Sequence, residues 1–179
     1  MEERRPCHKP MSGLDAAGIA AVLNEHCVQY VVIGAFAAIA QQAPIPATRD
    51  IDFTPGTSRD NLARLSAALH ELGARIRTEG VPEGLEFDHD GQSLARASVW
   101  NLTCERGEFD ISFRPSGIDG GYDELEPRSH LVIVDGTEVR VADLNDVIRS
   151  KEAAGRPKDL QVLPILYRWR DRHAGPPTD

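Results

Sequence analysis

The sequence predicts an α+β (mixed α/β) fold, in which helices pack on a mixed β-sheet and a helical pair lies at the C-terminal end. Two observations predict it. Strand patterns come in pairs joined by short turns, at about 98–104 with 107–113 and at 131–134 with 138–141. Helical patterns separate other strands without the strict repetition of a parallel βαβ array. We therefore expect helices to cover a sheet of mixed strand direction.

The chain begins its ordered part with a helix and a strand. Apolar residues at helical spacing predict a helix over about 13–26, with Ser12 or Asp15 placed to cap its start. Residues 30–33 are aromatic or β-branched and predict a short strand. Gly34 then opens an alanine-rich segment that favours a helix. The glycine therefore marks the point where a strand becomes a helix.

The next predicted strand, residues 48–53, carries two acidic residues. Side chains alternate along a strand, so Asp50 and Asp52 share one face while Ile51 and Phe53 point into a core. Carboxylates two residues apart, at roughly 6.6 Å, repel each other unless a cation lies between them. Their hard oxygen ligands suit Mg²⁺, which binds one or two carboxylates together with water and substrate phosphates. The pattern indicates a metal-dependent phosphate-transfer site.

The remaining elements follow from spacing and turn residues. An amphipathic pattern predicts a helix over 58–72, and residues 74–78 are compatible with a strand. The polar, glycine-containing stretch 79–93 shows no clear pattern. Two helices are predicted near the end of the chain, at about 142–154 and 158–172.

The predicted strand at 107–113 carries a third carboxylate. One face of that strand holds three apolar side chains, Phe109, Ile111 and Phe113, and the opposite face holds three polar ones, Asp110, Ser112 and Arg114. We therefore expect Asp110 to be exposed on a half-buried strand.

Length and composition indicate one globular domain. The chain has 179 residues, of which 41% are hydrophobic and 27% charged. We expect this domain to span 12–173, with its helical C-terminal part at 142–173. The polar segments 1–11 and 174–179 are expected to be a flexible lead and a flexible tail.

Charge and cysteine usage exclude several classes of protein. A formal net charge of −8 argues against coating nucleic acid through bulk positive charge, although a local basic patch could still grip an RNA end. The three cysteines, Cys7, Cys27 and Cys104, are odd in number and show no C-x-x-C spacing. The first residues lack the apolar core of a signal peptide, and no apolar run reaches the length of a membrane span. We expect a reduced, cytoplasmic protein without membrane contact.

The order of these residues resembles the polymerase-β-like nucleotidyltransferase superfamily. Members have a Gly-Gly or Gly-Ser turn, an Asp-x-Asp on the next strand and a third acidic residue on a later strand. The matching residues here are Gly34-Ala35, Asp50 with Asp52, and Asp110. Ala35 lacks the serine hydroxyl but is small, so backbone N–H groups at a helix N-terminus could still approach phosphates. The resemblance implies that Gly34 and Ala35 contribute to nucleotide binding.

A second segment, residues 150–160, resembles the helix-turn-helix of AbiEii-like nucleotidyltransferases, which include toxins of bacterial toxin-antitoxin systems. The resemblance implies that Lys151 contacts the nucleotide phosphates and that Asp159 completes the site. The local sequence is compatible with two helices joined by a turn. Gly155 suits a helix C-cap and Pro157 suits the first turn of the next helix. Asp159 lies in that first turn, where the helix dipole favours a negative charge.

The implied reaction is attack by a hydroxyl on the α-phosphorus of a nucleoside triphosphate, with pyrophosphate leaving. Asp50, Asp52 and Asp110 would hold one or two Mg²⁺ ions, and Asp110 would lie nearest the nucleophile. Lys151 would neutralise the phosphates. Arg49 points to the opposite face of a regular strand, so it reaches phosphate only if the strand bends.

The leading function is a toxin that adds nucleotides to the 3′ end of tRNA, with a cognate antitoxin as a partner. One alternative is a transferase that modifies an antibiotic hydroxyl, of the aminoglycoside or lincosamide type, because the net negative charge would favour a cationic drug. Another alternative is a domain that binds a nucleotide or a partner without turnover. Ala35, which stands where members of the superfamily have Gly or Ser, is compatible with this alternative.

Overall fold

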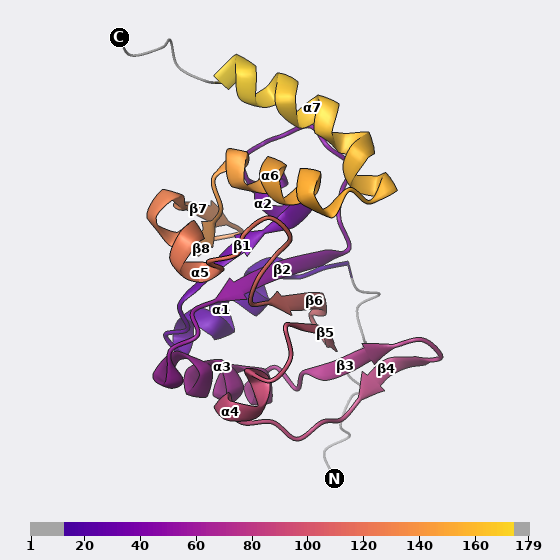
Figure 1. Ribbon diagram of the computed structural model, residues 1–179. Helices are drawn as coiled ribbons and strands as arrows, with labels where there is room; N and C mark the ends of the chain where they lie inside the picture. The colour runs from indigo at the N-terminus through magenta and orange to yellow at the C-terminus, as the bar shows by residue number, and fades with distance from the viewer. Residues whose placement is uncertain (1–12, 174–179) are drawn as a thin grey trace.

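The computed structural model describes residues 13–173. The expected flexible lead and tail, the candidate cap Ser12 and the thiol of Cys7 lie outside the described residues. Eight strands of the described part form one sheet in the order β4-β3-β5-β6-β2-β1-β8-β7. Figure 1 shows α1, α3 and α4 on one side of this sheet and α2, α6 and α7 on the other. The α+β fold predicted from the sequence is confirmed.

The sheet mixes both strand directions. Its strands are β1 (Tyr30–Ile33), β2 (Asp50–Pro55), β3 (Arg75–Thr78), β4 (Val81–Leu85), β5 (Val99–Cys104), β6 (Gly107–Ser112), β7 (His130–Val134) and β8 (Thr137–Val141). β2 pairs with β6, and β1 with β8, in parallel. The other neighbouring strands are antiparallel, including the two predicted hairpins β5–β6 and β7–β8. The parallel pairing of β2 and β6 brings together strands that lie more than fifty residues apart in the sequence.

The helices of the described part include five that the sequence predicted and three short ones that it did not. They are α1 (Ala16–Glu25), α2 (Gly34–Ala40), α3 (Arg59–Glu71), α4 (Gly91–Leu94), α5 (Tyr122–Leu125), the 3₁₀ helix η1 (Glu126–Arg128), α6 (Leu144–Ala154) and α7 (Pro157–His173). Asp15 caps α1 by accepting the Gly18 N–H, as the sequence predicted. Gly155 ends α6 in the left-handed conformation with φ +58°, and Pro157 begins α7. None of the helices in 13–173 is long and apolar enough to cross a membrane.

A large part of the core lies between the sheet and the helices α1 and α3. Ile51 and Phe53 of β2 are fully buried, as are Phe109 and Ile111 of β6. Tyr30 packs edge-on against Phe53, with ring centroids 5.1 Å apart. The alternation predicted for both strands is confirmed, because every apolar side chain of these two pairs points into the core. The polar faces of β2 and β6 are therefore left on the opposite side of the sheet.

Short elements occur where the sequence predicted none. β4 and α4 lie in the stretch 79–93, and α5 with η1 lies before β7. β4 contains Pro82 and Gly84, which disfavour a strand in isolation. It forms because it pairs with β3 at the edge of the sheet, where a proline need not donate a hydrogen bond. Tertiary pairing, and not local preference, therefore decides this element.

Candidate active site

The two aspartates of β2 and the aspartate of β6 lie on one face of the sheet. In the parallel pairing of these strands Asp52 is the direct partner of Asp110, and Asp50 is the partner of Glu108. Side chains of directly paired residues point to the same face. The structure therefore places the three sequence-predicted carboxylates on one face of the sheet, together with a fourth, Glu108.

The carboxyl group of Asp52 has an unusual environment. Burial raises the pKa of Asp52 from 3.8 to about 7. The carboxylates of Asp50 and Asp110 contribute to this rise, because like charges disfavour ionisation. Lys151 and Lys158 act on the same pKa in the opposite direction. The face of the sheet that carries Asp50, Asp52, Glu108 and Asp110, called the acidic face below, therefore has an excess of negative charge around Asp52.

An arginine binds the two acidic residues of β6. Nη1 of Arg77 donates to Oε2 of Glu108 at 2.8 Å, and Nη2 donates to Oδ1 of Asp110 at 2.7 Å. Burial raises the pKa of Asp110, and Arg77 opposes that rise. Arg77 comes from β3, which is separated from β6 by β5. Its side chain therefore reaches across a whole strand.

Gly34 packs tightly against the site. It ends the connection from β1 and opens the seven-residue helix α2, with φ +77°. A Cβ atom built on Gly34 would lie 2.4 Å from Oδ2 of Asp52. Only glycine satisfies both the positive φ and this close approach. Ala35 follows in the first turn of α2, as the sequence predicted.

The turn between α6 and α7 holds a buried ion cluster. Nζ of Lys151 lies 3.0 Å from Oδ1 of Asp159, and Nε of Arg156 lies 2.6 Å from Oδ2 of the same carboxylate. Asp159 is fully buried. Burial acts to raise the pKa of Asp159, but the hydrogen bonds from Arg156 and Lys151 outweigh it and the pKa is lowered. Asp159 therefore joins the two helices, and much of the charge of Lys151 is compensated by Asp159.

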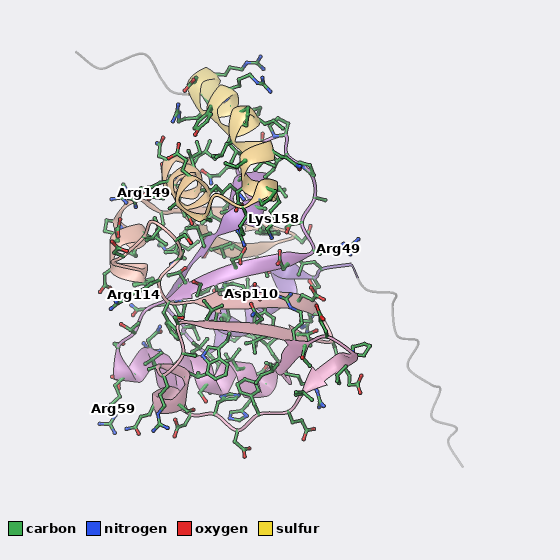
Figure 2. The ribbon with its side chains drawn as sticks, turned by 45° about the vertical axis from the view of Figure 1, so that its right-hand side comes forward. Arg49, Arg59, Asp110, Arg114, Arg149 and Lys158 are labelled. Carbon is green, nitrogen blue, oxygen red and sulfur yellow. The ribbon has the colours of Figure 1, made fainter. Side chains whose placement is uncertain are left out.

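Lys158 lies in the first turn of α7 and is exposed. Figure 2 shows it between α7 and β2, on the side of the sheet that faces the C-terminal helices. Its charge lowers the pKa of both Asp52 and Asp110. None of the ion pairs formed within residues 13–173 involves Lys158. Its ammonium group is available to a ligand above the acidic face.

Similar folds occur in solved structures of nucleotidyltransferases. A Thermotoga maritima protein described as a nucleotidyltransferase, TM1012, aligns with a TM-score of 0.51 and 16% identity over 87% of this chain and 90% of its own. The antibiotic-resistance factor ANT(2'')-Ia aligns with a TM-score of 0.51 and 17% identity over 87% of this chain and 89% of its own. The crystal structure of ANT(2'')-Ia with adenylyl-2''-tobramycin gives 0.50 and 16%, over 87% and 95%. The fold is that of the nucleotidyltransferases.

No family model and no curated protein sequence matches the chain. The nucleotidyltransferase fold rests on architecture, because the identities to the solved structures lie below 20%. Membership of the AbiEii-like group stays a prediction from the sequence.

A large cavity adjoins the acidic face of this nucleotidyltransferase fold. Its volume is about 1050 Å³, and its lining includes Thr48, Arg49 and Glu108. Thr48 donates a hydrogen bond of 2.8 Å to Oδ1 of Asp50, so the cavity begins beside the paired aspartates. Three further glutamates line it: Glu71, Glu83 and Glu105. Arg49, predicted to contact nucleotide only through a bend in the strand, lies in the wall of this cavity just before β2.

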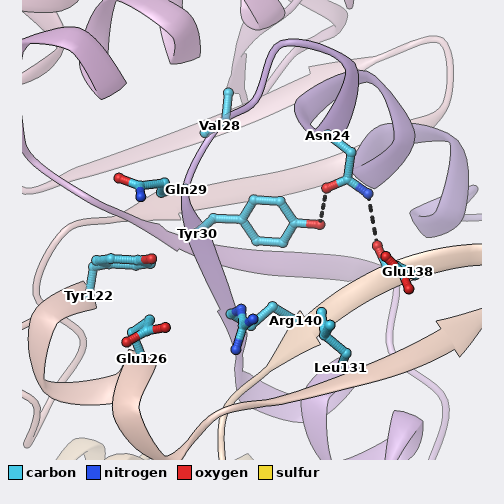
Figure 3. A pocket seen from close by; sticks show the side chains of 9 residues that line it. All are labelled: Asn24, Val28, Gln29, Tyr30, Tyr122, Glu126, Leu131, Glu138 and Arg140. Carbon is cyan, nitrogen blue, oxygen red and sulfur yellow. Dashed lines mark hydrogen bonds between the residues drawn. The ribbon is translucent and has the colours of Figure 1, made fainter.

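A second cavity of about 400 Å³ lies at the other end of β1, where that strand begins. Figure 3 shows Tyr30 in its middle, with Asn24 linking the Tyr30 hydroxyl to the backbone oxygen of Glu138. Arg140 also lines this cavity. Gly34 follows the last residue of β1, so the strand separates this cavity from the acidic face.

The donors around Asp52 fit a magnesium ion. Asp50 and Asp52 offer hard carboxylate oxygens, and the pKa of Asp52 is raised first by burial and then by the charges of Asp50 and Asp110. A bound cation would offset both effects by stabilising the ionised carboxylate. Within residues 13–173, no three His, Cys, Asp or Glu side chains gather closely enough to hold one ion. Asp110 is bound to Arg77, so its predicted role as a third metal ligand stays a prediction.

Several residues of the site were missed by the sequence analysis. They are Arg77, Glu108, Arg156 and Lys158. Glu108 precedes Asp110 by two residues, so the alternation that selected Asp110 also selects Glu108. Lys158 directly precedes Asp159 in the segment 150–160. Nothing in the local sequence signals Arg77, because it reaches the site only through the pairing of β3 with β5.

Proposed function

We propose that this protein is a metal-dependent nucleotidyltransferase, which transfers a nucleoside monophosphate from a nucleoside triphosphate to a hydroxyl acceptor. The observation that carries the proposal is the pairing of Asp52 with Asp110 on adjacent parallel strands, with Asp50 on the same face. The nucleotidyltransferase fold supports it. Carboxylates on one face, next to a lysine that forms no ion pair within residues 13–173, are suited to bind a triphosphate through a divalent cation.

The residues of the chain divide the work of this reaction. Asp50 and Asp52 would hold the magnesium ion, which when bound neutralises phosphate charge and lowers the pKa of the attacking hydroxyl. Lys158 binds the triphosphate from above the sheet, where its ammonium group forms no ion pair among the described residues. Gly34 leaves the space that Asp52 occupies.

Asp110 accepts the proton of the acceptor. Its raised pKa, caused by burial, suits it to this role. The hydroxyl oxygen forms a bond to the α-phosphorus while the bond to the β-phosphate oxygen breaks, and pyrophosphate leaves. The proton of the hydroxyl passes to Asp110, and Oδ2 is the oxygen left for it because Oδ1 binds Arg77.

The test is transfer of label from α-³²P nucleoside triphosphates, in the presence of Mg²⁺, to a panel of hydroxyl acceptors. Asp50→Asn and Asp52→Asn are each expected to lower the rate by at least about 100-fold, as for other groups that stabilise transition-state charge. Asp171→Asn is the matched control, since Asp171 is exposed near the end of α7 and, within residues 13–173, pairs only with Arg170. Equal rates in all three variants would refute metal-dependent transfer at this site. No transfer to any acceptor by the wild type would favour a domain that binds nucleotide or a partner without turnover.

For the acceptor we propose the 3′ end of tRNA, which would make the protein the toxin of a toxin-antitoxin pair. The segment with Lys151 and Asp159 supports this, because it resembles that of AbiEii-like enzymes. Expression in bacteria should then arrest growth, and label should appear on the 3′ terminal nucleotide of tRNA. Growth arrest that persists in the Asp52→Asn variant would contradict this assignment.

A cationic antibiotic is the second candidate acceptor. Two observations favour it: the cavity beside Asp50 is lined by four glutamates against two arginines, and the fold is similar to that of ANT(2'')-Ia. An acidic cavity attracts a polycation and repels an RNA backbone. Incubation with both tRNA and aminoglycosides separates the candidates. Label on the drug alone would remove the toxin assignment.

A further inference from the structure

Arg77 connects the acidic face to a distant edge of the sheet. It lies on β3 and binds both acidic residues of β6, Glu108 at 2.8 Å and Asp110 at 2.7 Å. The two contacts use different nitrogen atoms, Nη1 and Nη2. A guanidinium group holds its donors in a rigid planar fork, so it fixes direction as well as charge. The side chain of Arg77 is 27% exposed and that of Asp110 is 17% exposed, so the pair is largely shielded from water.

The contacts of Arg77 separate four carboxylates into two pairs. Asp50 and Asp52 on β2 face Glu108 and Asp110 on the neighbouring strand. Among the residues that the structure describes, Arg77 forms ion pairs only with the two carboxylates of β6. The pair on β2 is left to other cations, and the charges that lower the pKa of Asp52 come from Lys151 and Lys158. One pair therefore has a fixed internal counter-ion and the other does not.

The contacts of Arg77 with Glu108 and Asp110 also lie between the large cavity and the paired aspartates of β2. Glu108 lines the cavity of about 1050 Å³ that begins beside Asp50. Asp110 faces Asp52 across the strand pair. Arg77 thus holds one carboxylate on the cavity side and one on the side of the paired aspartates.

We propose that Arg77 is a positioning residue, which keeps Glu108 and Asp110 from competing for the metal at Asp50 and Asp52 and fixes Asp110 toward the acceptor hydroxyl. The inference rests on the proposed nucleotidyltransferase function. Without Arg77, four carboxylates would share one face with no bound counter-ion from β3, and any divalent cation would be drawn to all of them. Asp110 would then rotate toward that cation and away from the hydroxyl.

The proposal predicts opposite changes in two measurements. In Arg77→Gln the affinity for Mn²⁺, measured by electron paramagnetic resonance, should rise at least about threefold because two carboxylates lose their counter-ion. The kcat of nucleotide transfer should fall about 100-fold, the size expected from a misplaced reacting group. A residue that only supports the fold would lower both. Arg77→Lys keeps the positive charge but loses the planar guanidinium group that binds both carboxylates. Mn²⁺ affinity should therefore stay near that of the wild type while kcat falls.

Arg106→Gln is the matched control. Arg106 also pairs with a carboxylate at 2.7 Å, that of Asp15, but lies in the turn between β5 and β6 away from the acidic face. Its substitution removes the same charge and should leave Mn²⁺ affinity unchanged. An equal rise in Arg106→Gln would assign the effect to net charge and overturn the proposal.

The two hypotheses fail in different ways. Unchanged or weaker Mn²⁺ binding by folded Arg77→Gln overturns the positioning role, whatever the activity. Normal Mn²⁺ binding without transfer to any acceptor overturns the proposed function, while the Mn²⁺ affinities still decide whether Arg77 keeps the carboxylates of β6 from the ion. If circular dichroism shows that Arg77→Gln does not fold, Arg77→Lys is the deciding variant. A wild-type kcat in Arg77→Lys would overturn the positioning role of the guanidinium group. A lower kcat with unchanged Mn²⁺ affinity would support it.

Discussion

Gly34 and Asp52 occupy adjoining space so tightly that a single methyl group at Gly34 would collide with the carboxylate. The built Cβ lies 2.4 Å from Oδ2 of Asp52, and the φ of Gly34 is +77°. Real Cβ atoms essentially never approach another heavy atom this closely. The turn at the end of β1 therefore determines where the central carboxylate of the site can lie.

Gly34→Ala should lower nucleotide transfer by about 100-fold, because Asp52 must move to admit the methyl group. Its strained φ should also cost about 1–3 kcal/mol of stability. Gly136→Ala is the control, since Gly136 has φ +82° but no atom within 4 Å of its Cβ. Gly136→Ala should lose stability because of its strained φ, but the rate of nucleotide transfer per folded molecule should not change. Urea unfolding and initial rates measure the two effects, and equal loss of activity in both variants would contradict the collision.

Asp52→Asn should stabilise the metal-free protein in a pH-dependent way. The folded-state pKa of Asp52, about 7, lies above the ordinary 3.8, so the folded state keeps a proton that the unfolded chain releases. The Asp52 carboxyl therefore lowers stability progressively as pH rises from about 4 to about 7. The advantage of the Asn variant should grow over this window and level off above it. Urea unfolding with a chelator present measures it, and Asp119→Asn, in an exposed turn, is the control. A difference in the free energy of unfolding between Asp52→Asn and the wild type that is the same at all pH values would show that ionisation of Asp52 is not its cause.

Asp159→Asn should destabilise the fold by about 3–5 kcal/mol, the cost of leaving a buried charge without its partner. Asp159 is fully buried, and the side chain of Lys151 is 10% exposed. Asp171→Asn, which breaks the exposed pair with Arg170, should cost less than about 1 kcal/mol. The free energy of unfolding from urea titration compares them. Equal costs would mean that the buried cluster does not hold α6 and α7 together.

Lys158→Gln should weaken nucleotide binding. Removing a charge-assisted contact costs about 1.5–3 kcal/mol, which raises the KM for the nucleoside triphosphate by roughly 10- to 100-fold. Arg59→Gln is the control, since Arg59 is exposed on α3 on the other side of the sheet. Initial-rate kinetics with varied triphosphate measure the effect. A KM unchanged by Lys158→Gln would remove this residue from the phosphate site.

Much of the fold could be predicted from local pattern. The alternation of apolar and acidic residues in β2 and β6 identified the buried face and the acidic face before any pairing was known. Helix α3 followed from its apolar spacing, and the turn between α6 and α7 from Gly155 and Pro157. These features depend on residues close together in the chain, so the sequence alone contains them.

The missed elements depend on partners far away in the sequence. β4 forms at the edge of the sheet despite Pro82 and Gly84, because β3 supplies its hydrogen bonds. The ion pair of Lys151 also could not be predicted from the neighbouring residues in the sequence. The sequence suggested a phosphate ligand, and the structure adds its ion pair with buried Asp159.

The sequence by itself determined that Asp50, Asp52 and Asp110 would lie on the polar faces of their strands, opposite the apolar side chains, since the alternation of side chains is a local property of an extended backbone. The expectation that Asp110 is exposed was wrong, because its side chain is only 17% exposed beside Arg77. Only the tertiary structure decided that Asp52 and Asp110 lie side by side and that Arg77 binds Asp110. The physical reason is that strand order and register are set by packing and hydrogen bonding between segments tens of residues apart, which no local pattern encodes.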